Sequence, residues 1–238
     1  MSVTSRKKVR GKLLVIEGVD GSGKATQVDI LKKRLEKEGV KTKCIDFPRY
    51  YNNLFGELIG ECLSGKRGDF IKTDAWVAST LYAADRFESS GEIREWINEG
   101  FWVVADRYVS ANQIHQGGKI KDLKSRKDFL DWLERLEFGV FSLPRPDAVI
   151  YLDLPLEVVW ERLKSKSLKR TERYLKGGKD VAEADPEYLT NSRNTALDLE
   201  RRNTDWFKVD CSKKGVCLTP GEVAEEIFDI IEANLMER

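Results

Sequence analysis

A glycine-rich turn near the amino end constrains this chain more than any other stretch. Residues 13–16 are apolar and have the length of a buried strand, and a G-x-x-x-x-G-K pattern follows from Gly18 to Lys24. An amphipathic helical pattern starts directly after it and runs to Leu35. Strand, turn and helix in this order indicate a phosphate-binding P-loop, because curled backbone N–H groups and a helix N-terminus attract anions. We therefore expect the chain to bind nucleotide phosphates.

One position departs from the usual pattern. The motif calls for Ser or Thr after the lysine, where a hydroxyl would hold Mg²⁺, but the chain has Ala25 followed by Thr26. A methyl group cannot bind a metal ion. The carboxylates of Asp20 and Asp106 are the candidate magnesium ligands, directly or through water, since Mg²⁺ keeps several waters in most protein sites.

Composition excludes several classes of protein. The 238 residues suit one large domain, and 41 basic against 40 acidic residues give no overall argument for a nucleic-acid or membrane partner. Four cysteines without a C-x-x-C pair, together with a single histidine, argue against a zinc site. No apolar run is long enough to span a membrane, and no signal peptide is evident, so we expect a cytoplasmic protein with reduced thiols.

Strand and helix patterns alternate along the chain and predict an α/β fold with a five-stranded parallel sheet and helices on both faces. The expected strands are residues 13–16, 40–47, 101–108, 148–154 and 206–209. The expected helices are residues 24–38, 53–63, 74–89, 92–98, 125–141, 186–202 and 219–235, with one more after Pro155. Residues 1–10 are interpreted as a disordered basic tail and 11–238 as a single domain. Within that domain, the basic, glycine-containing segment of about 164–183 suits a lid.

Three arginines are candidates for binding a second anion, in addition to the phosphates at the P-loop. Arg49, Arg86 and Arg107 come from separate loops or helix ends, and guanidinium groups bind phosphate bidentately. A P-loop for donor phosphates, acidic groups beside it and a basic lid are the parts that phosphoryl transfer requires. A GTPase switch fits poorly, since no Asn-Lys-x-Asp signature follows the P-loop.

With these pieces assembled, residues 12–235 resemble the thymidylate kinase family of nucleoside monophosphate kinases. The matching motifs are Glu17-Gly-Val-Asp-Gly-Ser-Gly-Lys24, Phe47-Pro-Arg-Tyr50, Leu81-Tyr-Ala-Ala-Asp-Arg86, Asp106-Arg-Tyr108 with Asn112, and Leu143-Pro-Arg-Pro-Asp147. The resemblance implies a P-loop NTPase fold with a small lid and the reaction of ATP with dTMP to give ADP and dTDP. It also implies Mg²⁺ as cofactor, small-molecule partners only, and a homodimer.

The resemblance also implies residue roles. The catalytic group would be Lys24, Asp20, Arg107 and Arg173. ATP would contact Gly18, Asp20, Gly21, Ser22, Gly23, Lys24, Ala25 and Thr26, with Asp210 and Cys211 bordering adenine. The acceptor would contact Asp20, Phe47, Pro48, Arg49, Tyr50, Tyr82, Arg86, Arg107, Ser110, Asn112 and His115. The lid would contribute Arg170, Arg173, Asp180 and Glu183.

Within the acceptor set the roles differ. Arg49 and Arg107 would bind the phosphate of dTMP, Tyr82 would stack on thymine, and Arg86 and Asn112 would hydrogen-bond the base. His115 stands where relatives often have an aromatic residue against the sugar. Because Gly21 and Ser22 leave the P-loop without a basic side chain at its variable positions, the lid must supply the catalytic charge, and Arg173 is favoured.

Two alternatives remain open at this point. The chain could be another nucleoside or nucleotide kinase that accepts dUMP or a related monophosphate. It could also be a non-catalytic P-loop protein that binds nucleotides or nucleic acid, an idea motivated by Ala25 and the basic tail.

Overall fold

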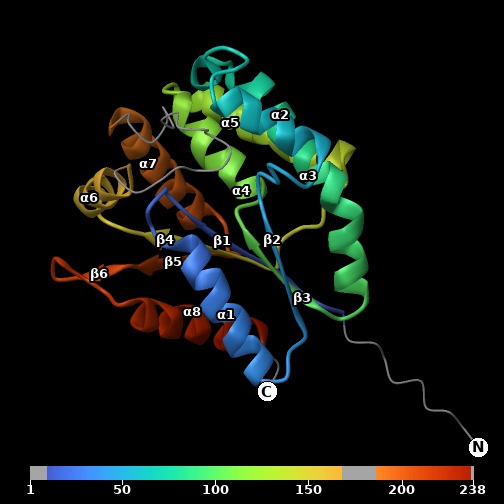
Figure 1. Ribbon diagram of the computed structural model, residues 1–238, viewed down its shortest axis with the longest axis vertical. Helices are drawn as coiled ribbons and strands as arrows, with labels where there is room; N and C mark the ends of the chain where they lie inside the picture. Colours follow the sequence, from blue (N-terminus) through green and yellow to red (C-terminus); the bar gives the residue numbers. More distant parts are fainter. Residues whose placement is uncertain (1–9, 168–185, 237–238) are drawn as a thin grey trace, which may run out of the picture.

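A five-stranded parallel sheet forms the centre of the computed structural model, which describes residues 10–167 and 186–236 (Figure 1). The strands are β1 (Leu13–Gly18), β2 (Thr42–Asp46), β3 (Trp102–Asp106), β4 (Ala148–Asp153) and β5 (Trp206–Asp210). Their order is β2-β3-β1-β4-β5, and each neighbouring pair is parallel. The predicted sheet is confirmed. Its central strand β1 leads into the glycine-rich turn, so that turn lies at the middle of the carboxyl edge, where open parallel sheets bind ligands.

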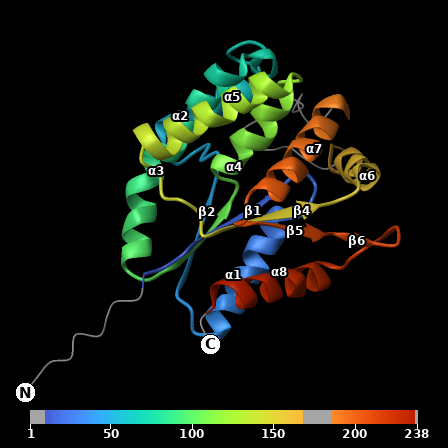
Figure 2. The same cartoon turned by 180° about the vertical axis from the view of Figure 1, so that it is seen from behind.

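Helices account for most of the remaining described chain. They are α1 (Lys24–Lys37), α2 (Leu54–Leu63), η1 (Phe70–Lys72), α3 (Ala75–Asn98), α4 (Val109–Ala111), η2 (Asn112–Gln116), η3 (Gly117–Lys119), α5 (Leu123–Glu134), η4 (Arg135–Val140), α6 (Leu156–Ser167), α7 (Pro186–Arg202) and α8 (Pro220–Leu235). Figures 1 and 2 show α1 and α8 on one face of the sheet and α2, α3, α5 and α7 towards the other. Within the described ranges, no helix is long and apolar enough to cross a membrane.

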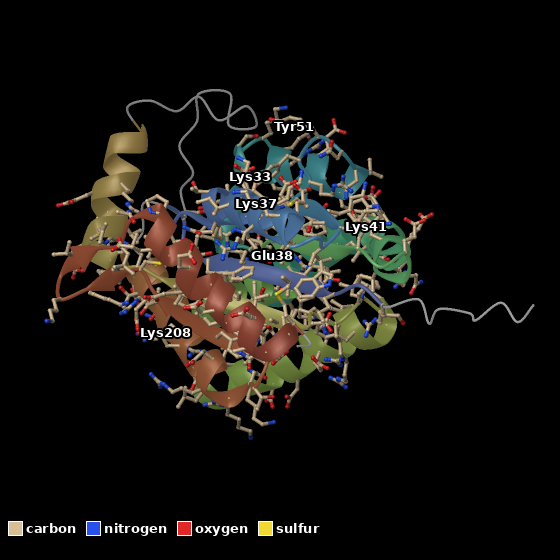
Figure 3. The ribbon with its side chains drawn as sticks, turned by 90° about the horizontal axis from the view of Figure 1, so that it is seen from below. Lys33, Lys37, Glu38, Lys41, Tyr51 and Lys208 are labelled. Atoms are coloured by element: carbon tan, nitrogen blue, oxygen red, sulfur yellow. The ribbon has the colours of Figure 1, made fainter. Side chains whose placement is uncertain are left out.

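Two apolar cores result from the alternation of side chains along β1. Leu14 and Ile16 point to the face covered by α1 and α8, whereas Leu13 and Val15 point to the face covered by α3 and α7. All four side chains are fully buried, as expected for a central strand with helices on both sides. The outer side of α1 is charged instead, and Lys33 and Lys37 are exposed on it (Figure 3).

Helix starts follow local sequence signals. Asp74 accepts hydrogen bonds from the backbone N–H groups of Trp76 and Val77 at the start of α3, and Thr219 forms a capping box with Glu222 at the start of α8. These side chains satisfy backbone donors that have no partner inside the helix. The predicted start of α7 at Pro186 is confirmed, since proline suits the first helical turn.

Two local expectations need correction, and one short element was not expected. The predicted helices 74–89 and 92–98 form one helix, α3, because the helical backbone continues through Gly91 without a break. The predicted helix 125–141 changes at Arg135 into the π-helical turn η4. A short antiparallel hairpin of β6 (Ser212–Lys213) and β7 (Val216–Cys217) follows β5 and was not foreseen, because two-residue strands leave no periodic pattern.

Candidate active site

The P-loop of the structure joins β1 to α1 through three glycines with positive φ. Gly23 has φ 102° and directly precedes α1, a conformation that residues with a Cβ rarely adopt. A Cβ at Gly18 would lie 2.6 Å from the Oγ of Ser22. The turn therefore requires glycine at both positions. It leaves the first N–H groups of α1, from Lys24 to Thr26, without helical partners at the cavity, which favours an anion there.

Lys24 is held against the loop that it follows. Its Nζ donates to the carbonyl oxygens of Gly18 (3.0 Å) and Val19 (3.2 Å) and lies 3.5 Å from a carboxylate oxygen of Asp20. Burial lowers the pKa of the Lys24 ammonium, Arg107 lowers it further, and the surrounding carboxylates oppose the change. The side chain is 8% exposed. A cation fixed at a helix N-terminus in this way suits the outer phosphates of a nucleotide.

Arg107 is the centre of a second polar cluster. Its Nη2 donates to Asp20 Oδ1 (2.8 Å), and its Nη1 lies 2.6 Å from the Nε2 of His115 and 3.8 Å from the buried carboxylate of Glu17. The backbone has φ 68°, an uncommon conformation for an arginine. Strained backbone of this kind clusters at functional sites. The turn after β3 thus brings this guanidinium close to the P-loop, as the sequence predicted.

His115 is neutral and carries its proton on Nδ1. Arginine has N–H donors and no acceptor, so the Nε2 of His115 must accept from Arg107. Burial lowers the histidine pKa well below its ordinary value of 6.5, and the charge of Arg107 lowers it further. The ring stacks on Tyr188 of α7 with centroids 5.9 Å apart. His115 is therefore an uncharged hydrogen-bond acceptor for Arg107 that packs against Tyr188.

The acidic groups beside the P-loop differ in their protonation. Desolvation opposes ionisation of Asp20, but Arg107 and Lys24 outweigh it and hold its pKa far below the usual range. Burial raises the pKa of Asp106, although Lys24 and Arg107 oppose that effect. Burial also raises the pKa of Glu17, to about 7. Asp20 is thus the most strongly ionised of the three.

One cavity of about 390 Å³ connects the P-loop to a second region. At one end it is lined by Asp20, Lys24 and Arg107, and at the other by Tyr82 and Arg86 of α3. Its other lining residues are Gly21, Gly23, Ala25, Thr26, Asp46, Phe47, Pro48, Tyr50, Leu63, Phe70, Ile71, Asp106, Ala111, Asn112, His115, Gln116, Lys119, Tyr188 and Leu189. The cavity therefore has a phosphate-binding end and an end that is largely aromatic and amide in character.

At that second end, two of the predicted residues share one buried partner. Arg86 donates through Nε (2.6 Å) and Nη2 (2.7 Å) to the carboxylate of Glu137, and Asn112 donates to the same carboxylate (2.9 Å). Arg86 is 2% exposed and Glu137 is fully buried. The side chain of Glu137 comes from η4, after α5. Sequence reasoning did not single it out, because an acid on an amphipathic helical pattern looks like a surface residue.

The three arginines that were expected to meet at one anion have separate partners in the structure. The charge of Arg86 is already compensated by Glu137. Arg49 donates to the Oγ of Ser89 (3.1 Å) and to Glu92 (2.9 Å), and it is not part of the cavity lining. Arg86 has its partner on η4, and Arg49, in the loop after β2, has both of its partners on α3. Arg107 is the one of the three that lines the phosphate-binding end.

Other predicted residues lie outside the cavity lining. Ser110 is buried, with its Oγ lacking a hydrogen-bond partner in the described chain. Gly18 and Ser22 belong to the P-loop but do not line the cavity. Asp210 ends β5 and pairs with Lys208, and Cys211 follows it and donates its backbone N–H to the carbonyl oxygen of Asp153. The lid residues Arg170, Arg173, Asp180 and Glu183, and nearly all of the predicted tail, lie outside the described residues.

Two further basic residues at the cavity or at the P-loop were missed from sequence. Lys119 of η3 lies at the cavity, and burial lowers its pKa to about 8 while Asp74 and Asp69 oppose the change. Arg162 of α6 donates to the carbonyl oxygen of Gly21 (3.1 Å) in the P-loop. Neither residue belongs to a local motif. Only the packing of separate elements brings them to the site.

Two carboxylates could hold a metal ion beside the P-loop. Asp20 and Asp106 line the same end of the cavity, and the side chain of Asp106 has no hydrogen-bond partner among the described residues. Described side chains form no cluster of three or more acidic, histidine or cysteine ligands. Two carboxylates beside a phosphate-binding turn nonetheless fit Mg²⁺, which is commonly bound by one or two carboxylates and the substrate's phosphates.

Comparison with known proteins gives a consistent result. The thymidylate kinase family model matches residues 16–218. A thymidylate kinase of Thermosipho africanus is 30% identical over 223 residues, 93% of this chain and 98% of its own length. One from Mycobacterium tuberculosis is 30% identical over 155 residues, 65% of this chain and 72% of its own. The solved structure of thymidylate kinase from Candida albicans superposes with a TM-score of 0.71 at 27% identity, and covers 94% of this chain and 92% of its own.

Proposed function

The chain belongs to the thymidylate kinase family, and from this we propose that it transfers the γ-phosphoryl group of ATP to dTMP, giving ADP and dTDP. The observation that carries the proposal is the single cavity that joins the P-loop to the pair Arg86 and Asn112. A kinase of this type must hold a triphosphate and a monophosphate acceptor in line, and one continuous cavity with unlike ends meets that requirement.

At the phosphate-binding end, Lys24 and the N-terminal N–H groups of α1 bind the outer phosphates of ATP. Arg107 lies between Asp20 and His115 and faces the position where acceptor and donor phosphates meet. Its guanidinium stabilises charge that spreads over the transferring group, and preorganised donors of this kind supply much of the catalysis in such reactions. Arg173 of the lid is proposed to add a second positive charge.

At the other end, Tyr82 stacks on the thymine ring, and Arg86 and Asn112 hydrogen-bond its edge. Phe47 and Tyr50 also line the cavity. Arg49 would reach the acceptor phosphate only after its guanidinium leaves Glu92, which the negative charge of dTMP favours. Asp210 and Cys211 are proposed to border adenine.

Mg²⁺ is proposed as the cofactor, held by Asp106 and Asp20 together with the phosphates of ATP. When bound, it would neutralise charge on those phosphates. Asp106 is the better protein ligand, because Asp20 already pairs with Arg107 and Lys24. Its raised pKa indicates a group that gains from a nearby cation.

A homodimer in the cytoplasm is the proposed form of the protein, acting on small molecules alone. Exposed apolar side chains support it: Phe87 of α3 contacts Phe141, with ring centroids 4.9 Å apart, next to the exposed Val140. Apolar exposure of this kind is typical of interaction surfaces. Sedimentation at micromolar concentration should give a dimer, and a monomer there would refute this assembly.

The function is tested by a coupled assay with ATP, Mg²⁺ and a panel of monophosphates. We expect dTMP to have the highest kcat/KM among dTMP, dUMP, dCMP, AMP and GMP. Some activity with dUMP is expected, because one methyl group contributes only about 1–3 kcal/mol of discrimination. Equal or faster turnover of dCMP, AMP or GMP would refute the assignment, and the absence of turnover would favour a nucleotide-binding protein without catalysis.

A further inference from the structure

Glu137 is a fully buried carboxylate that phosphoryl transfer itself does not require. It accepts three hydrogen bonds, two from Arg86 and one from Asn112. Buried ions persist only when they are paired and hydrogen-bonded, and this pairing joins two residues of the cavity. Arg86 Nη2 and Asn112 Nδ2 both donate to the same oxygen, Oε1, so the two side chains are held as neighbours.

The carboxylate fixes the orientation of the Asn112 amide. The Nδ2 of Asn112 donates to the carbonyl oxygen of Ser79 (3.1 Å) and to Glu137 (2.9 Å). Turning the amide over would set its oxygen against two acceptors, which is unfavourable. Both N–H bonds of Asn112 are therefore used inside the protein. Its Oδ1 has no partner among the described residues and remains as an acceptor for the cavity, which Asn112 lines.

Arg86 is oriented in the complementary sense. Its Nε and Nη2 are directed to Glu137, so the other edge of the guanidinium, with Nη1, is left for the cavity that Arg86 also lines. Guanidinium nitrogen atoms only donate. The base end of the cavity thus presents a donor from Arg86 beside an acceptor from Asn112.

This pattern distinguishes between pyrimidines. Thymine and uracil present a carbonyl acceptor at position 4 and an N–H donor at position 3, whereas cytosine presents an amino donor at position 4 and a bare acceptor nitrogen at position 3. We propose that Glu137 is a positioning residue which, through Arg86 and Asn112, selects bases of the thymine pattern over cytosine. The inference rests on the proposed function, because it concerns the acceptor nucleotide.

The test is Glu137→Gln, assayed with dTMP and dCMP. In glutamine an NH₂ group replaces one carboxylate oxygen and must face N–H donors, either Nε of Arg86 or both Nη2 of Arg86 and Nδ2 of Asn112, so at least one of the three hydrogen bonds is lost and the negative charge that holds both side chains is gone. The Asn112 amide is then free to turn and offer a donor. The ratio of kcat/KM for dTMP to that for dCMP should fall about 10- to 100-fold. The KM for ATP should stay unchanged, since Glu137 has no contact with the P-loop.

Glu134→Gln is the matched control. It makes the same change three residues earlier, on an exposed carboxylate that pairs with Arg145, and it should leave the substrate ratio at the wild-type value. A purely structural role for Glu137 would lower activity with both monophosphates alike and leave their ratio unaltered.

Glu137→Asp serves if the glutamine variant does not fold. It keeps the charge but is one methylene shorter, so it should lose at least one of the three hydrogen bonds and lower the ratio by a smaller factor. A folded variant of either kind with a ratio within about twofold of wild type would overturn the inference. A wild-type enzyme without preference for dTMP over dCMP would instead refute the proposed function, before any variant is made.

Discussion

Replacement of Glu17 by glutamine should stabilise the protein above neutral pH. Glu17 ends β1 just before the P-loop, is fully buried, and neither carboxylate oxygen has a hydrogen-bond partner in the described chain. Burial raises its pKa from 4.5 to about 7. Arg107 and Lys24 oppose this change, and Asp106 and Asp20 add to it. The charged form of this group is therefore unfavourable in the folded protein.

The direction of the pH effect follows from the raised pKa. Between pH 4.5 and about 7 the folded protein binds the Glu17 proton more tightly than the unfolded chain does, so stability falls as pH rises through this window. Above both values the cost to folding is about 3 kcal/mol. Glutamine has the same shape and no charge to bury. The stability gained by Glu17→Gln should thus be about 2 kcal/mol larger at pH 8 than at pH 5.

Urea unfolding of wild type and Glu17→Gln at pH 5, 6, 7 and 8 measures this difference. Comparing the two proteins at each pH cancels groups that titrate in both. Glu134→Gln, an exposed carboxylate changed in the same way, should differ from wild type by a small amount that does not vary with pH. A difference between Glu17→Gln and wild type that is constant from pH 5 to pH 8 would refute the reasoning.

Two further predictions concern catalysis. Ala25→Ser should change kcat by less than about tenfold, because in the proposed site Asp106 and the nucleotide phosphates hold Mg²⁺ without a hydroxyl at position 25. A gain of several orders of magnitude would show that the metal lacks a ligand in the wild-type enzyme. Arg173→Ala should lower kcat far more than it raises the KM for dTMP, since a lid charge acts mainly in the transition state. The opposite pattern in steady-state kinetics would make Arg173 a substrate-binding residue.

Much of the site could be predicted because its parts are local. The glycines, the lysine and the following helix of the P-loop are contiguous in sequence, and each of them predicts the same phosphate-binding turn. Arg107 directly follows a buried strand, which places it at the carboxyl edge of the sheet. Lys24, Asp20 and Arg107 accordingly lie together in the structure. The predicted stacking residue Tyr82 and the base-contacting pair Arg86 and Asn112 stay proposals, although all three line the cavity.

Partners of charged groups could not be predicted. Arg86 and Arg49 looked alike in the sequence, as arginines at helix or loop ends. In the fold, Arg86 is paired with Glu137, 51 residues away, and Arg49 with Glu92. An isolated sequence gives no information on which carboxylate neutralises which guanidinium, because that depends on the packing of helices far apart in the chain.

The sequence by itself determined the sheet, the P-loop and the family, because hydrophobic periodicity and short motifs depend on neighbours along the chain. Tertiary structure decided the electrostatics. Burial in the fold raises the pKa of Glu17 and lowers that of His115, and the packing of η4 pairs Glu137 with Arg86 and Asn112. The physical reason is that burial and pairing depend on elements brought together from distant parts of the chain, and these two terms govern the protonation and orientation of polar groups.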